Sequence, residues 1–203
     1  FIYEPNSQIK EKLKEERVQL TDARAMLLFM LYKLVANGEF VSEFSSEKIC
    51  YFLQRFGAKE HFKLDYKPNF YGPYSGKVKY VINYLNGSYI MGYSSMDKKP
   101  FETLDLVSDG FEKVEGYILS KPELVEIVNR TELFLDGFYS EFALELLSTV
   151  DYISLNKDTF DLEIIKSELE GWSERKRTLF SNDRFLNISI NHLKEHFGWY
   201  YDI

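Results

Sequence analysis

Cysteine and long apolar runs are both scarce in this sequence, and each shortage excludes a class of protein. The one cysteine, Cys50, excludes an internal disulfide and fits a reducing compartment. The longest apolar run, residues 25–32, is far shorter than the roughly 18 residues that a membrane helix needs. We also find no signal peptide. These absences predict a cytoplasmic protein without membrane contacts.

Positive charge is the next shortage. The 203 residues contain 25 Lys and Arg against 32 Asp and Glu, which gives a net charge of −7 and a pI of about 5.1. This balance disfavours non-specific binding to nucleic acid and would suit a basic partner. Because the chain begins at Phe1 and not at Met, we expect a fragment of a longer protein.

Glycine and proline are too few to build a long linker, with 11 and 5 copies respectively. No stretch rich in either residue divides residues 20–203, so we predict one domain there and treat residues 1–19 as a linker or N-terminal extension. A hydrophobic content of 45% and this length are sufficient for a substantial core.

Apolar periodicity predicts an α+β fold that is mainly α, a single helical domain with a few short strands. Thr21 and Asp22 cap a helix over residues 23–36, which is apolar nearly all round and should be the central buried helix, with Leu28 fully buried. Short strands are expected at residues 61–66 and 104–107. The other expected helices are 47–56, 77–85, 109–119, 121–135, 139–155, 161–170 and 182–197.

The sequence His192-Leu-Lys-Glu-His196 matches the inverted zinc-protease motif, and on a helix the two histidines could share a metal. A zinc site needs a third protein ligand, however, and only seven residues follow His196. Solvent-facing histidines near a helix C-terminus are the favoured interpretation. We therefore predict no metal site, and a zinc hydrolase is the least favoured function.

No other group of residues indicates catalysis or a cofactor site. Cys50 lies between apolar residues on a core helix and is expected to be a buried structural thiol. The stretch Gly72–Lys77 is one residue too short for a phosphate-binding loop. Glu141, Glu145 and Asp151 are expected on the solvated side of their helix. We predict no catalytic residue and no cofactor.

Aromatic residues are abundant, with 17 Phe, 15 Tyr and 2 Trp. Several tyrosines lie in glycine-containing loops on either side of the expected helix 77–85. There they either pack the loops or contact a partner, because tyrosine is common at interface hot spots. Adjacent carboxylates would add charge to such a surface. The predicted partner-binding residues are Phe70, Tyr71, Tyr74, Tyr89, Tyr93, Asp97 and Glu102.

Several stretches together resemble the C-terminal domain of DarG antitoxins. They are Thr21–Leu28, Glu47–Gly57, Tyr71–Ser75, Leu85–Tyr93, Gly137–Val150 and Trp172–Lys176. Their order and spacing agree with that family over most of residues 20–199, but residues 101–105 and 159–161 depart from it. The tyrosine-bearing loops also look like the broader SocA/Panacea antitoxin domains.

The resemblance implies a toxin-binding domain over residues 20–203. Its partner would be a DarT-like toxin, an NAD-dependent transferase that ADP-ribosylates single-stranded DNA. The domain would occupy the toxin's DNA cleft by DNA mimicry, with carboxylates in place of phosphates and rings in place of bases. It would not be an enzyme or bind nucleic acid directly. The ADP-ribosyl glycohydrolase activity would belong to a separate macrodomain.

The alternative implied by the resemblance is a SocA/Panacea-type adaptor or antitoxin domain that binds a different toxin or a protease.

Overall fold

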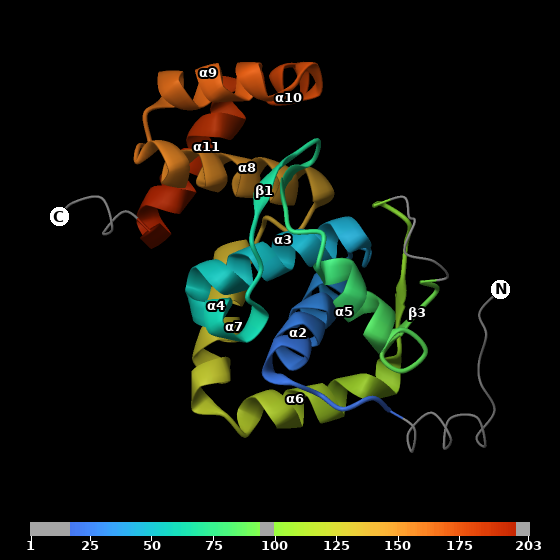
Figure 1. Cartoon of the computed structure of the whole chain (residues 1–203). Coiled ribbons are helices and arrows are strands. Elements are labelled where there is room, and N and C mark those ends of the chain that lie inside the picture. The colour runs from blue at the N-terminus through green and yellow to red at the C-terminus, as the bar shows by residue number, and fades with distance from the viewer. Residues whose placement is uncertain (1–16, 94–99, 198–203) are drawn as a thin grey trace. The chain divides into compact units, whose positions relative to one another are not determined.

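A computed structural model describes residues 17–93 and 100–197 of the chain, and Figure 1 shows its path. The fold is mainly helical with a few short strands, which confirms the predicted fold class. The chain forms two compact units, unit 1 with residues 1–64 and 76–133, and unit 2 with residues 65–75 and 134–203. The expectation that residues 20–203 behave as one domain stays a prediction.

Unit 1 contains most of the first two-thirds of the chain. Strands β3 and β4 pair antiparallel, with Ile90 opposite Leu106. The elements of unit 1 are α2 (Asp22–Ala36), α3 (Glu43–Leu53), the π-helical turn η1 (Gln54–Ala58), α4 (Lys59–Phe62), α5 (Val78–Leu85), β3 (Ile90–Met91), β4 (Asp105–Leu106), the 3-10 turn η2 (Ser108–Gly110), α6 (Phe111–Leu119) and α7 (Pro122–Leu135), whose last residues fall in unit 2.

Helix α2 is the core of unit 1, as its sequence predicts. The Thr21 hydroxyl accepts a hydrogen bond from the backbone N–H of Arg24 and so caps the helix. Helices α3 and α6 pack against α2 (Figure 1). Leu28 is completely buried, which confirms its predicted position in the core. Cys50 of α3 is buried as well, and burial raises the pKa of its thiol.

The start of α3 and the segment after it differ from the prediction. Helix α3 begins at Glu43 because Ser42 is the N-cap and exchanges hydrogen bonds with Ser45 in a capping box. Ser45 therefore lies inside the helix and does not precede it. The predicted strand 61–66 is wrong, because α4 includes residues 61 and 62, and Lys63, its C-cap, adopts a left-handed conformation.

The described residues of unit 2 form a β-hairpin, the end of α7 and four further helices, and the second strand of the hairpin packs against α8. The three helices expected here are present within a few residues of their predicted ends. The hairpin and α10 are additional. The elements of unit 2 are β1 (Lys67–Asn69), β2 (Gly72–Tyr74), α8 (Glu141–Lys157), α9 (Leu162–Trp172), α10 (Glu174–Leu179) and α11 (Asp183–Phe197).

Candidate functional site

The hairpin of unit 2 presents aromatic side chains at its tip. Asn69 pairs with Gly72 across the two strands, so Phe70 and Tyr71 form a two-residue turn. Gly72 has φ 95°, a conformation that other residues rarely adopt, which explains why glycine follows the turn. The rings of Phe70 and Tyr71 meet edge to face, with their centroids 4.8 Å apart. Phe70 is about half exposed.

An open cleft of 630 Å³ lies between the hairpin tip and the end of α9. The indole Nε1 of Trp172 donates a hydrogen bond to the carbonyl of Asn69 at 2.9 Å and so ties α9 to the hairpin. The cleft combines aromatic and small polar side chains. Its lining residues are Pro68, Asn69, Phe70, Ser167, Glu168, Gly171, Trp172 and Ser173.

A buried ionic cluster supports this cleft from the side of α8. Arg175 forms a two-pronged salt bridge with the carboxylate of Glu145, one arm of which is Nη2 to Oε2 at 2.9 Å. The guanidinium carbon of Arg175 lies 4.9 Å from the ring centroid of Tyr71 and 5.6 Å from that of Phe70. Glu145 therefore holds the cation that packs against the hairpin tip.

Lys176 completes the cluster from the inside. Its ammonium Nζ lies 2.6 Å from Oε1 of Glu145 and donates to the hydroxyl of Thr149 at 3.1 Å. The side chain is completely buried, and this burial lowers the pKa of Lys176 to about 8, although the Glu145 carboxylate opposes the shift. Because solvent does not reach Lys176, we assign it a positioning role and no contact with a ligand.

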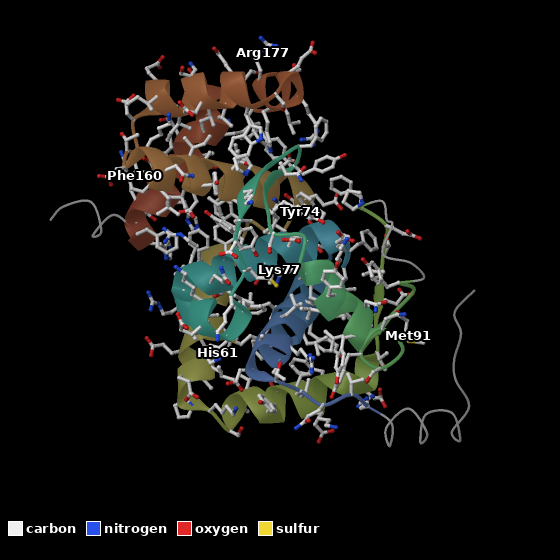
Figure 2. All side chains as sticks on the ribbon, in the orientation of Figure 1. His61, Tyr74, Lys77, Met91, Phe160 and Arg177 are labelled. Carbon is white, nitrogen blue, oxygen red and sulfur yellow. The ribbon has the colours of Figure 1, made fainter. Side chains whose placement is uncertain are left out.

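The predicted partner-binding residues divide between the two units. Phe70, Tyr71 and Tyr74 lie on the hairpin of unit 2, and Figure 2 labels Tyr74 there. Tyr89 and Tyr93 are buried in unit 1, where the hydroxyl of Tyr93 donates to the Glu43 carboxylate at 2.8 Å. Glu102 is exposed in unit 1, and Asp97 lies outside the described residues. Their roles in binding stay predictions.

The sequence interpretation did not assign Trp172, Arg175, Glu145 or Lys176 to a site. Glu145 was expected in solvent, but it is almost completely buried, as is Asp151. One signal in the sequence could have indicated that Glu145 is buried: apolar residues precede and follow it directly in the expected helix. Its partners come from a separate helix more than 25 residues later, so spacing along the chain could not reveal the pairs.

The two histidines of α11 do not form a metal site with other described residues. Within residues 17–93 and 100–197, no three His, Cys, Asp or Glu side chains are close enough together to hold a metal ion. The ring of His192 stacks on Phe134 and Phe138, and its Nε2 donates to the carbonyl of Phe134 at 2.7 Å. Burial lowers the pKa of His192. The expectation of a solvent-facing His192 is therefore wrong.

Comparison with known proteins identifies relatives that all carry the same name. The chain is 28% identical over 181 residues to a DNA ADP-ribosyl glycohydrolase of Thermus aquaticus, a match that covers 88% of this chain and 49% of that protein. Proteins of the same name from Mycobacterium bovis and Mycobacterium tuberculosis are 20% identical over 197 residues, which covers 90% of this chain and 55% of each. The chain thus spans about half the length of these curated relatives. No known protein-family profile matches it.

These names overturn the functional part of the sequence interpretation. The relatives are named as glycohydrolases and not as antitoxins, so the assignment to a DarG-type antitoxin domain, with DNA mimicry and a DarT-like toxin as partner, is wrong. The SocA/Panacea alternative has no support either. The predictions of no enzyme and of no direct contact with nucleic acid are also contradicted, because the relatives' name describes an enzyme that acts on DNA.

Among the described residues, no helix is both long enough and apolar enough to cross a bilayer.

Proposed function

We propose that this chain is part of a DNA ADP-ribosyl glycohydrolase, an enzyme that removes ADP-ribose from DNA. The observation that carries the proposal is the 28% identity over 88% of the chain to the Thermus aquaticus protein of that name. Because the chain spans about half of that relative, the activity is proposed for the whole protein that contains this chain.

The proposed reaction is the hydrolysis of a glycosidic bond. Water adds its oxygen to the anomeric carbon of the ribose, and the bond from that carbon to the DNA breaks. The electron pair of the broken bond stays on the DNA atom, which takes up a proton, and ADP-ribose leaves with a new hydroxyl group. Such a substrate carries several flat heteroaromatic rings, including the DNA bases and the adenine of ADP-ribose.

The cleft of unit 2 is the surface that we propose for one of these rings. Phe70 and Trp172 offer aromatic faces, and aromatic side chains stack on bases with little dependence on sequence. Asn69, Ser167 and Ser173 add hydrogen-bonding groups at the edges. The Glu145–Arg175 pair holds the hairpin tip in place, so the cleft does not need to form when the ring enters.

Hydrolysis of ADP-ribosylated DNA tests the proposed activity. The whole protein that contains this chain is incubated with an ADP-ribosylated oligonucleotide, and the release of ADP-ribose is followed over time. We expect release at an enzymatic rate. If the modification persists under conditions in which the Thermus aquaticus relative removes it, the proposed function is wrong.

Substitutions at the cleft test its role in the same assay. Phe70→Ala and Trp172→Ala should raise KM about tenfold, since stacking on one ring contributes roughly 1–3 kcal/mol. Phe40→Ala is the control, because Phe40 is an exposed ring in unit 1 outside the cleft. Competition with free adenosine and with free thymidine distinguishes the adenine of ADP-ribose from a DNA base. Unchanged KM values in both cleft variants would remove the cleft from the binding site.

A further inference from the structure

Acidic residues are absent from one stretch of this acidic chain. Residues 66–96 contain no Asp or Glu, although the chain has 32 of them in 203 residues. Helix α5 lies within this stretch and carries Lys77 at its N-cap and Lys79 in its first turn. Figure 2 labels Lys77 at the start of the helix. The net charge of −7 therefore does not describe this stretch of the chain.

Helix α5 divides into a buried face and an exposed aromatic face. Val78, Ile82 and Leu85 are completely buried. Tyr80 and Tyr84 are 57% and 44% exposed, so both rings remain in contact with solvent. They are four residues apart on the helix, which places them on the same face with a rise of about 6 Å between them.

Basic side chains accompany both exposed rings. The guanidinium carbon of Arg24, from α2, lies 3.6 Å from the ring centroid of Tyr84. The ammonium of Lys79 lies 5.4 Å from the ring centroid of Tyr80. Cations beside exposed rings are the combination that proteins use to bind single-stranded nucleic acid, with rings for the bases and cations for the phosphates.

We propose that the α5 face, defined by Arg24, Lys77, Lys79, Tyr80 and Tyr84, binds single-stranded DNA. The choice of DNA rests on the proposed function, and the choice of a single strand rests on the rings. Duplex bases are stacked on one another at about 3.4 Å, which leaves no base face for a side chain. Two rings about 6 Å apart fit bases that have left the stack.

Direct binding of unmodified DNA tests this proposal without any catalytic step. A fluorescein-labelled oligothymidine dodecamer is titrated with the 203-residue chain at about 50 mM salt, and anisotropy is measured. We expect saturable binding that weakens with salt, with a slope in log units of about −2 for three cations. A duplex of the same length should bind at least tenfold more weakly, as expected without stacking.

Variants of the two tyrosines separate stacking from general attraction. Tyr80→Ala and Tyr84→Ala should each weaken binding about tenfold, whereas Tyr80→Phe and Tyr84→Phe keep the rings and should stay within about twofold of wild type. Circular dichroism confirms that each variant is folded. Equal affinities of the Ala variants and wild type, or equal binding of duplex and single strand, would overturn the proposal.

Charge reversal provides a second test with a matched control. Lys77→Glu with Lys79→Glu should reduce the affinity and flatten the salt slope by about one unit or more. The control is Lys59→Glu with Lys113→Glu, because both residues are exposed in unit 1 and lie outside the acid-free stretch, so the net charge changes equally. If the two double variants lose the same affinity, the α5 face has no specific role.

The binding and hydrolysis assays together distinguish a failure of the α5 proposal from a failure of the proposed glycohydrolase function. Binding of the oligothymidine without hydrolysis by the whole protein would support the α5 face and contradict the glycohydrolase proposal. If the chain does not bind the oligothymidine, and the whole protein with Tyr80→Ala or Tyr84→Ala hydrolyses its substrate at the wild-type KM, the glycohydrolase proposal is supported and the role of the α5 face is contradicted.

Discussion

The central helices of the two units, α2 and α8, are both buried but differ in what they bury. All the buried residues of α2 are apolar, from Ala25 to Leu31 together with Leu34. Helix α8 is buried continuously from Leu144 to Asp151, and this stretch includes the charged Glu145 with its partner Lys176 from α10. Unit 1 therefore buries only apolar side chains at its centre, whereas the central helix of unit 2 also buries a charge that is tolerated there because it is paired.

The largest expected effect is the loss of the buried carboxylate. Glu145→Gln should cost about 3–5 kcal/mol of unfolding free energy, because the buried Lys176 ammonium loses its counter-charge. Urea unfolding measures the effect through tryptophan fluorescence, since Trp172 belongs to unit 2.

Glu141→Gln on the same helix is the control for this variant, because Glu141 is exposed. A loss below about 1 kcal/mol for Glu145→Gln would contradict the charge-pairing account of unit 2. The double variant Glu145→Leu with Lys176→Met should recover most of the stability, because neither charge then remains in the interior.

Leu28→Ala should cost about 2–5 kcal/mol, because Leu28 is fully buried in α2 and the cavity does not refill. Far-UV circular dichroism during urea unfolding measures the loss. Val35→Ala is the control on the same helix, since Val35 is 46% exposed and should lose little. A loss below about 1 kcal/mol would remove α2 from the centre of unit 1.

The same Leu28→Ala variant tests the single-domain prediction. If residues 20–203 unfold as one domain, tryptophan fluorescence from unit 2 should shift as far as circular dichroism does. If the fluorescence transition stays at its wild-type position, the two units unfold independently and the single-domain prediction is wrong.

Alkaline pH should affect the stability of unit 2 through Lys176. The pKa of Lys176 is about 8 in the folded chain against an ordinary value of 10.5, so the unfolded chain binds more protons between these values. We therefore expect the wild-type protein to gain stability between about pH 8 and pH 10.5. Measured as the unfolding free energy of wild type minus that of Lys176→Met, the gain should be at most about 3 kcal/mol. Below pH 8 the difference between the two proteins should be constant. A difference that falls over this range would contradict the lowered pKa.

The smallest expected effect is a difference in stability loss between substitutions at two buried tyrosines of unit 1. Tyr93→Phe should cost about 1–2 kcal/mol, because the Glu43 carboxylate loses a buried donor. Tyr89→Phe should stay within about 0.5 kcal/mol, because the hydroxyl of Tyr89 has no hydrogen-bond partner among the described residues. Thermal unfolding of both variants measures this difference. Equal losses of stability in the two variants would show that the hydrogen bond between Tyr93 and Glu43 does not contribute to the stability of unit 1.

Most helices could be predicted because their signals are local. Thr21 caps α2 and Asn86 ends α5, and both signals involve residues within one turn of the helix end. The hairpin was missed because its strands are only three residues long and too short for alternation to be visible. The start of α3 was placed at residue 47 instead of Glu43, because the sequence alone does not show the hydrogen bonds between Ser42 and Ser45 that make Ser42 the N-cap.

The candidate site was predictable only in part. Phe70 and Tyr71 were singled out because aromatic rings near a glycine-containing turn are candidates for partner contacts, and the structure places Phe70 in the lining of the cleft. The opposite wall and its support come from Trp172 and Arg175, about one hundred residues later in the chain. Nothing in the local sequence connects these residues to the hairpin.

The sequence by itself determined the helical character of the chain, the burial of α2 and the positions of most helix ends, because these depend on side-chain periodicity and on hydrogen bonds between near neighbours. Only the tertiary structure decided which charges are buried and which rings meet. Glu145 is stable in the interior because Arg175 and Lys176 reach it from another helix, and without these partners burial of a carboxylate would be too unfavourable.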